Sequence, residues 1–192
     1  MSRFEQVIAA IDAANSADPK MENGQPSERL YGERMSAMLL AFRPEASEFL
    51  RIAARGQHIE RWTLPRNAYP MTKPGYYAWR NAAKKMHAER VGALMAEAGY
   101  SDEEIAATQA MVRKEDLRAN PDAQTVEDLA SLVFLKHYGL DFAHGRTPEQ
   151  LVDILVKTMR KMSPDALAFA GRIGMPDAVA GLVGEAARKL PA

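Results

Sequence analysis

Two histidines and an acidic pair are the side chains whose types and spacing favour chemistry in this chain. His58 ends an apolar helical run, His87 follows 29 residues later, and Glu127-Asp128 opens a later apolar helix. Imidazole nitrogens and carboxylate oxygens are ligands that suit Mn²⁺, Fe²⁺, Ni²⁺ or Zn²⁺. A metal bound there would acidify a water molecule into a nucleophile near neutral pH. The sequence predicts a divalent-metal site at His58, His87 and Glu127 or Asp128, with structural histidines as the alternative.

A basic segment surrounds the first histidine. Residues 51–90 contain nine Lys or Arg against two Glu, a local net charge of +7 in a chain whose formal net charge is zero. Arginine binds phosphate or carboxylate through paired hydrogen bonds, and aromatic rings stack on a base or sugar. The alternative is a solvated basic face with the tryptophans packed under a loop. Substrate contacts are therefore predicted for Arg61, Trp62, Arg66, Tyr69, Trp79 and Arg80.

The composition is that of one globular domain. The chain has 192 residues, of which 47% are apolar and 26% charged. It has no cysteine, which excludes disulfides and zinc–thiolate sites. Its apolar runs are too short to cross a bilayer and its first residues do not form a signal peptide, so a cytoplasmic protein with no membrane partner is expected. Zero net charge disfavours nucleic acid and leaves an anionic small molecule as the expected partner; the oligomeric state is not determined by these features.

Helical periodicity runs through the whole chain, and no segment alternates as a strand, so the fold is predicted to be all-α. Residues 63–75 contain Pro65, Pro70 and Pro74, which exclude a long helix there. Helix starts are predicted at Ser27, Pro44, Ser101, Pro121 or Thr125, Thr147, Ser163 and Pro176. The helix from Pro44 is expected to run to His58, and the helix that carries His87 is expected over residues 76–98.

The helices over residues 28–58 resemble the opening of the HD-type metal hydrolases, in which a ligand histidine precedes an apolar helix that ends in His-Asp. Tyr31-Gly32-Glu33-Arg34-Met35 stands at the first place, so the resemblance puts Glu33 where the first histidine would be. His58 matches the second histidine, and Ile59 replaces the aspartate.

Later positions extend this resemblance. His87 matches a helix histidine of two-metal members, and Lys114 stands where a further histidine can occur. Val126-Glu127-Asp128-Leu129 matches the final acidic motif; spacing favours Glu127 and residue type favours Asp128. The resemblance implies catalytic roles for Glu33 and Lys114.

A narrower resemblance covers roughly residues 3–175. The chain is similar to the bacterial and fungal family catalogued as domain of unknown function 4202, which brings no established activity with it. The motifs that carry it are Gln57-His58-Ile59, Arg61-Trp62, Pro65-Arg66, Tyr69-Pro70, Trp79-Arg80, Lys114, Glu127-Asp128-Leu129-Ala130, Phe134-Leu135 and Lys161-Met162-Ser163. Together the resemblances imply a single HD-like helical bundle over residues 1–192, with short final helices over 163–190.

These observations predict a metal-dependent hydrolase that acts on a phosphorylated small molecule, with a nucleotide as one candidate. Two alternatives stay open. The first is a catalytically degenerate HD-like scaffold that binds an anionic ligand or a protein partner. The second is an HD-type oxygenase that uses two irons.

Overall fold

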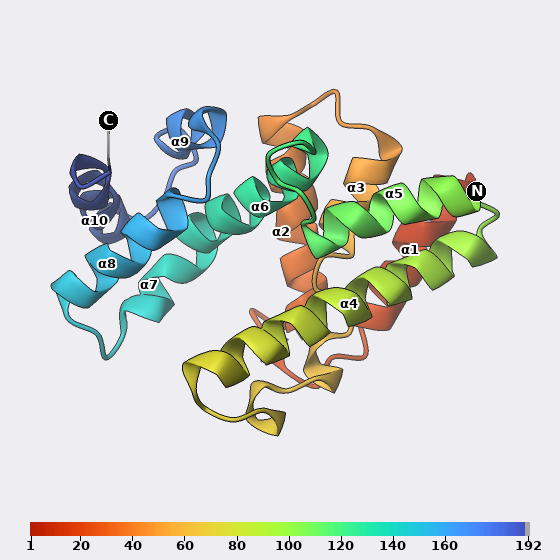
Figure 1. Ribbon diagram of the computed structural model, residues 1–192, viewed down its shortest axis with the longest axis horizontal. Helices are drawn as coiled ribbons and strands as arrows, with labels where there is room; N and C mark the ends of the chain where they lie inside the picture. The colour runs from red at the N-terminus through yellow and green to blue at the C-terminus, as the bar shows by residue number, and fades with distance from the viewer. Residues whose placement is uncertain (191–192) are drawn as a thin grey trace. The chain divides into compact units, whose positions relative to one another are not determined.

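The computed structural model describes residues 1–190, and most of these residues lie in helices (Figure 1). Among these residues the only strands are two of two residues each, β1 (Met21–Glu22) and β2 (Gln25–Pro26). The predicted all-α class is confirmed. By their contacts, the residues group into two compact units, Met1–Val126 and Glu127–Ala192, and the single HD-like domain over residues 1–192 stays a prediction. Each unit is described by itself.

The first unit is a bundle of five helices and the start of a sixth. Its elements are α1 (Arg3–Asn15), α2 (Ser27–Phe42), α3 (Glu48–Arg55), α4 (Lys73–Glu97), α5 (Asp102–Arg113) and the first part of α6 (Pro121–Val133). Helix α4 packs along α5 and also contacts α1, while α3 contacts α1, α2 and α5 (Figure 1). Fully buried apolar side chains at these contacts, such as Ile11, Met35, Ile52 and Val91, form the core that holds the histidine-bearing segments together.

The segment between α1 and α2 contains a tight hairpin that sequence periodicity missed. Asn23 and Gly24 connect the two strands with φ values of 51° and 79°, the pair of positive angles that a two-residue hairpin turn of this kind requires. The hairpin leads directly into α2. Ser27 is the first helical residue rather than the predicted cap, and the carboxylate of Asp18 accepts from the Glu28 N–H at 2.9 Å in its place.

Helix α3 begins later than predicted. Pro44 lies in a turn before the helix, and Ser47 is the capping residue, because its hydroxyl accepts from the Leu50 N–H at 3.2 Å. A proline can occupy the first helical turn but provides no side-chain acceptor, whereas a serine satisfies one of the free N–H groups there.

Helix α3 also ends earlier than predicted, at Arg55, so that His58 lies in the turn that follows. Gly56 ends the helix at a place where the backbone closely approaches α4. A Cβ at Gly56 would lie 2.4 Å from the Cγ2 atom of Val91. Glycine therefore permits the contact that places His58 next to α4.

Two short 3₁₀ helices, η1 (Arg61–Thr63) and η2 (Arg66–Ala68), connect this turn to α4. The predicted absence of a long helix over 63–75 is confirmed. Helix α4 begins at Lys73, three residues before the predicted start, because the Thr72 hydroxyl accepts from the Gly75 N–H at 3.2 Å. Pro74 fits the first turn, where its missing N–H leaves no helical bond unmade.

The predicted starts of α5 and α6 depend on local caps. Ser101 and Glu104 form the expected capping box, with bonds of 3.3 and 2.8 Å. At α6 the side-chain oxygen of Asn120 accepts from the Ala123 N–H at 3.0 Å. This bond starts α6 at Pro121 rather than at Thr125.

The second unit contains the end of α6, a π-helical segment η3 (Phe134–Tyr138), α7 (Gly139–Ala143), α8 (Pro148–Met159), α9 (Pro164–Ala170) and α10 (Asp177–Arg188). Helix α10 packs against α7 and α8. The predicted starts at Thr147, Ser163 and Pro176 are confirmed as capping residues. Within the described chain, no helix combines the length and the apolar character that crossing a membrane requires.

Candidate functional site

His58 and His87 meet inside the first unit, although one follows α3 and the other lies in the middle of α4. Their ring centroids are 5.8 Å apart. The ring of Tyr31, from α2, stacks on His58 at 4.1 Å with 13° between the planes. The Tyr31 hydroxyl donates to the side-chain oxygen of Gln57 at 2.7 Å, which ties α2 to the same turn.

The protonation of His87 follows from its hydrogen bond. Its Nδ1 atom lies 2.7 Å from the carbonyl oxygen of Ile59, and because a carbonyl only accepts, Nδ1 carries the proton. Nε2 then holds a lone pair, and this buried atom has no hydrogen-bond partner among the described residues. Burial lowers the pKa of His87 to about 4, and the charges of Arg61 and Lys114 act in the same direction. His87 is therefore a neutral imidazole near pH 7.

His58 is held in the same tautomer by different partners. Its Nε2 atom lies 2.6 Å from Nη1 of Arg61, which only donates, so Nε2 is the acceptor and Nδ1 carries the proton. Nδ1 lies 3.6 Å from a carboxyl oxygen of Glu28. Burial lowers the pKa of His58 well below its usual range, and the neighbouring cation of Arg61 lowers it further.

Glu28 is a site residue that sequence reasoning missed. Its side chain is only 17% exposed, and burial raises its pKa to about 7, although the charge of Arg61 opposes the shift. The residue stands at the start of α2, and only the fold of the preceding loop brings that helix end to His58. An acidic residue in the first helical turn is common, so its type and position alone carried no signal.

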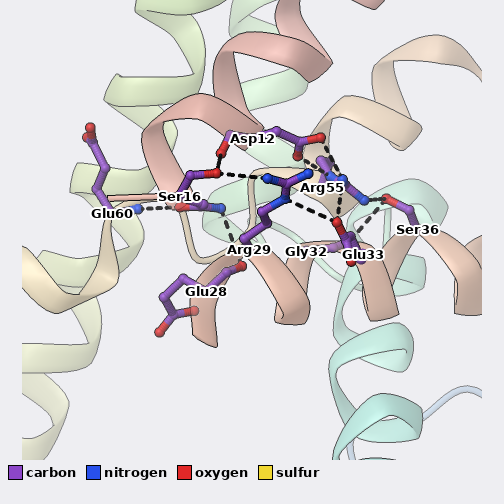
Figure 2. Close-up of polar contacts among 10 residues, drawn as sticks. Asp12, Ser16, Glu28, Arg29, Gly32, Glu33, Ser36, Arg55 and Glu60 are labelled. Carbon is purple, nitrogen blue, oxygen red and sulfur yellow. Dashed lines mark hydrogen bonds and ion pairs between the residues drawn. The ribbon is translucent and has the colours of Figure 1, made fainter. Parts of the chain in front are cut away.

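Glu33, which the resemblance placed at the first ligand position, lies in a different group of contacts. Figure 2 shows it beside two arginines, with its carboxylate 3.3 Å from Nε of Arg29 and 3.8 Å from Nη2 of Arg55. Arg55 also binds both carboxyl oxygens of Asp12 at 2.7 Å. This network joins α1, α2 and α3, so Glu33 stabilises the bundle while Glu28 is the α2 carboxylate that lies beside a histidine.

Three cationic side chains lie around the histidines. Arg61, Lys114 and Arg80 each lower the pKa of His58, which means that each is close enough to disfavour a second positive charge there. Lys114 ends α5 in a left-handed conformation, with φ of 57°. Arg80 on α4 and Lys114, which follows α5, thus both act on His58, and Lys114 also acts on His87.

The other predicted substrate contacts build the loop itself. Arg66 donates to the carbonyl oxygens of Tyr69 at 3.0 Å and Pro70 at 2.9 Å. Trp79 is 8% exposed and donates from Nε1 to the Leu64 carbonyl at 2.9 Å. Trp62 and Tyr69 are half-buried in the same loop.

The Trp79 ring has a second neighbour. The guanidinium of Arg61 lies 4.8 Å from the ring centroid. This cation–π contact restrains the Arg61 side chain beside His58.

Glu127 and Asp128 begin the second unit and are both buried. The carboxylate of Asp128 accepts from the N–H of Ser163 at 2.8 Å and from its hydroxyl at 2.6 Å. Since Ser163 caps α9, this pair fixes the start of that helix. The convergence of Glu127 or Asp128 with the histidines stays a prediction.

The donor atoms of the histidine site fit a metal only in part. No group of three or more His, Asp or Glu side chains within residues 1–190 is arranged to hold one. Nε2 of His87 offers a free lone pair, but Nε2 of His58 is engaged by Arg61. A metal at this place requires that Arg61 first release His58.

The structure is that of a mostly helical protein in which a buried histidine, His87, and a half-buried one, His58, are both neutral and lie near cationic side chains. A family model described as "Domain of unknown function (DUF4202)" matches residues 5–183. The chain belongs to this family, as the motif string predicted. No curated protein and no solved structure matches the chain.

Proposed function

We propose that the histidine site of the first unit binds the phosphate group of a small molecule and hydrolyses its ester bond. The observation that carries this proposal is that three cations, Arg61, Lys114 and Arg80, act on the neutral imidazole of His58, and that two of them, Arg61 and Lys114, also act on the neutral imidazole of His87. The carboxyl group of Glu28 lies 3.6 Å from Nδ1 of His58, and its pKa of about 7 means that it is only partly ionised near neutral pH. An anion entering the site would gain attraction that water screens little in a buried place.

Arg61 is the side chain best placed for recognition. Its guanidinium presents several N–H donors in a plane, which matches the oxygens of a phosphate. In the structure one of these donors is held by Nε2 of His58 at 2.6 Å. A phosphate that draws Arg61 to itself would free that nitrogen, so that ligand binding and exposure of the histidine lone pair would occur together.

Glu28 supplies the acid–base group for hydrolysis. A group with a pKa near the working pH is best suited to accept and return a proton. In the proposed reaction Glu28 takes a proton from water as the water oxygen bonds to phosphorus. The bond from phosphorus to the leaving alcohol oxygen breaks, and the proton returns from Glu28 to that oxygen.

A second candidate is a metal-dependent hydrolase of HD-like architecture, favoured by the free lone pair on Nε2 of His87. The bond from Nδ1 to the Ile59 carbonyl fixes that ring in the tautomer a metal ligand needs. His58, His87 and Glu28 would hold Mn²⁺, Fe²⁺, Ni²⁺ or Zn²⁺. Such an ion would supply Lewis-acid activation of the substrate and of water.

The first experiment measures anion binding and turnover. Titration with inorganic phosphate gives affinity, and phosphate release from a panel of sugar phosphates and nucleotides gives activity. Arg61→Met and Lys114→Met should each weaken phosphate binding by about tenfold or more, as expected for hydrogen bonds to a charged group. Lys85→Met is the control, because Lys85 is 74% exposed and pairs with Glu89 at 3.8 Å. Equal affinity in all four proteins would contradict the proposal.

Metal analysis separates the two candidates. Protein purified without chelator is assayed for bound metal as wild type, His58→Ala and His87→Ala. Metal bound to wild type and lost from both variants, together with hydrolysis that stops in a chelator, supports the metal-dependent candidate. Hydrolysis that persists in the chelator supports Glu28 as the base. Phosphate binding with no turnover on any substrate favours a binding scaffold.

A further inference from the structure

Asn15, the last residue of α1, joins two segments that carry the histidine site. Its side chain is buried, with only 1% of the residue exposed. Nδ2 donates to the carbonyl oxygen of Glu28 at 3.4 Å, and Oδ1 accepts from the N–H of Glu60 at 2.9 Å. One amide thus satisfies a main-chain acceptor on α2 and a main-chain donor just before η1.

Glu60 has a conformation that needs such a partner. Its φ of 54° lies in the left-handed region, which costs a non-glycine residue about 1–2 kcal/mol. Its N–H donates to Asn15, and its carboxylate pairs with Nε of Arg90 at 3.0 Å. Its carbonyl accepts from the Thr63 hydroxyl at 2.8 Å. Because Arg61 follows directly, the backbone angle at Glu60 sets the direction from which Arg61 reaches His58.

Both the main-chain N–H and the main-chain carbonyl of Glu28 are hydrogen-bonded. Its N–H donates to Asp18 at 2.9 Å, while its carbonyl accepts from Asn15. These two bonds fix the backbone from which the Glu28 carboxyl group faces His58. The partners of His58 on α2 and η1 are therefore tied to one buried side chain.

We propose that Asn15 is a positioning residue that couples Glu28 to Arg61, so that both side chains are held at His58 together. The expected effect of Asn15 on phosphate binding rests on the proposed function. The hydrogen bonds through which Asn15 positions the two segments do not. Only an amide of this length both donates to one segment and accepts from the other. Aspartate keeps the acceptor for Glu60 and loses the donor for Glu28, whereas alanine loses both.

The test compares Asn15→Ala and Asn15→Asp with a matched control, Thr108→Val. Thr108 is fully buried in the same unit and donates to the Glu104 carbonyl at 2.9 Å, so its replacement also removes a buried hydrogen bond. The readouts are the imidazole nitrogen signals of His58 and His87 by NMR, the affinity for inorganic phosphate per folded molecule, and the melting temperature.

We expect Asn15→Ala to shift the His58 signals and to weaken phosphate binding by about tenfold, the loss of one well-placed contact. Asn15→Asp should keep more of the affinity, because it preserves the Glu60 bond that directs Arg61. Thr108→Val should lower the melting temperature without shifting the His58 signals and without weakening phosphate binding. If Asn15→Ala does not fold, Asn15→Asp and the control carry the comparison.

Two outcomes are distinguishable. If the Asn15 variants lower the melting temperature but do not shift the His58 signals, as is expected of the control, Asn15 has only a structural role and the inference is wrong. If wild type binds no phosphate, the proposed function fails, while the His58 signals still decide whether Asn15 positions the site.

Discussion

The side chain of Glu28 is 17% exposed and His87 is buried, and burial shifts their pKa values in opposite directions. It raises the pKa of Glu28 to about 7 and lowers the pKa of His87 to about 4. In both cases the uncharged form is favoured, because a charge removed from water loses solvation. Near pH 7 the site therefore contains neutral imidazoles and a carboxyl group that is only partly ionised, and the surrounding Arg and Lys side chains supply positive charge.

Replacing Glu28 with Gln should stabilise the protein at high pH. The folded-state pKa of about 7 lies above the ordinary glutamate pKa of 4.5, so the stability that this carboxyl group contributes is complete below pH 4.5 and is lost as the pH rises through 7. Relative to Glu28→Gln, wild type should lose up to about 3 kcal/mol across that window, an order-of-magnitude figure. Urea unfolding of both proteins from pH 4 to pH 8 measures the difference.

His87 does not interfere with this comparison. Its depressed pKa gives a contribution that is present above 6.5 and is lost as pH falls through about 4, and both proteins share it. A difference in unfolding free energy that does not change with pH would show that Glu28 titrates normally and is exposed to water.

At the scale of elements, the site depends on how closely α3 approaches α4. Gly56 lies where a Cβ would be 2.4 Å from Val91 Cγ2 and 3.3 Å from Ile11 Cδ1. Valine is stiff in a helix, and interiors are close-packed, so neither neighbour can move at little cost. The turn that carries His58 begins at this contact.

Gly56→Ala should therefore lower the free energy of unfolding by about 1–3 kcal/mol, the usual range for overpacking a core. The matched control is Gly181→Ala in α10, where a Cβ would meet nothing within 4 Å. There the better helix former should raise stability by about 0.5–1 kcal/mol. Chemical denaturation measures both, and equal effects would mean that α3 and α4 are not in close contact at Gly56.

For the whole molecule, the distribution of charge favours small anions over nucleic acids as ligands. The +7 of residues 51–90 is balanced by acidic residues elsewhere, so that the formal net charge is zero. Binding to duplex DNA depends mainly on the number of phosphates that Lys and Arg neutralise. In the proposed site, three half-buried cations, Arg61, Arg80 and Lys114, would attract one phosphate group and would bind a long polyanion only weakly.

We accordingly expect double-stranded DNA to bind no more tightly than about 10⁻⁴ M at physiological salt, the weak end of non-specific binding. Fluorescence anisotropy with a labelled duplex measures this, with inorganic phosphate as the comparison ligand. Salt-dependent binding of the duplex in the micromolar range would instead indicate an exposed basic surface.

Local features allowed the helical class and most helix starts to be predicted from sequence. The capping boxes at Ser101 and Thr147 involve residues three apart, and the prolines of 63–75 act on their own turn. The motif string predicted the family, which is confirmed. It also singled out His58 and His87, whose rings lie 5.8 Å apart.

Tertiary structure alone decided what surrounds those histidines. The Asp18 cap determines where α2 starts, and so determines that Glu28 rather than Glu33 lies beside His58. The carboxyl group of Asp128 binds Ser163, which lies 35 residues further along the chain. Such contacts join residues that have no fixed separation in sequence, so helical periodicity cannot predict them. Burial, which sets the pKa values of the site, is likewise a property of the packed bundle and not of any one segment.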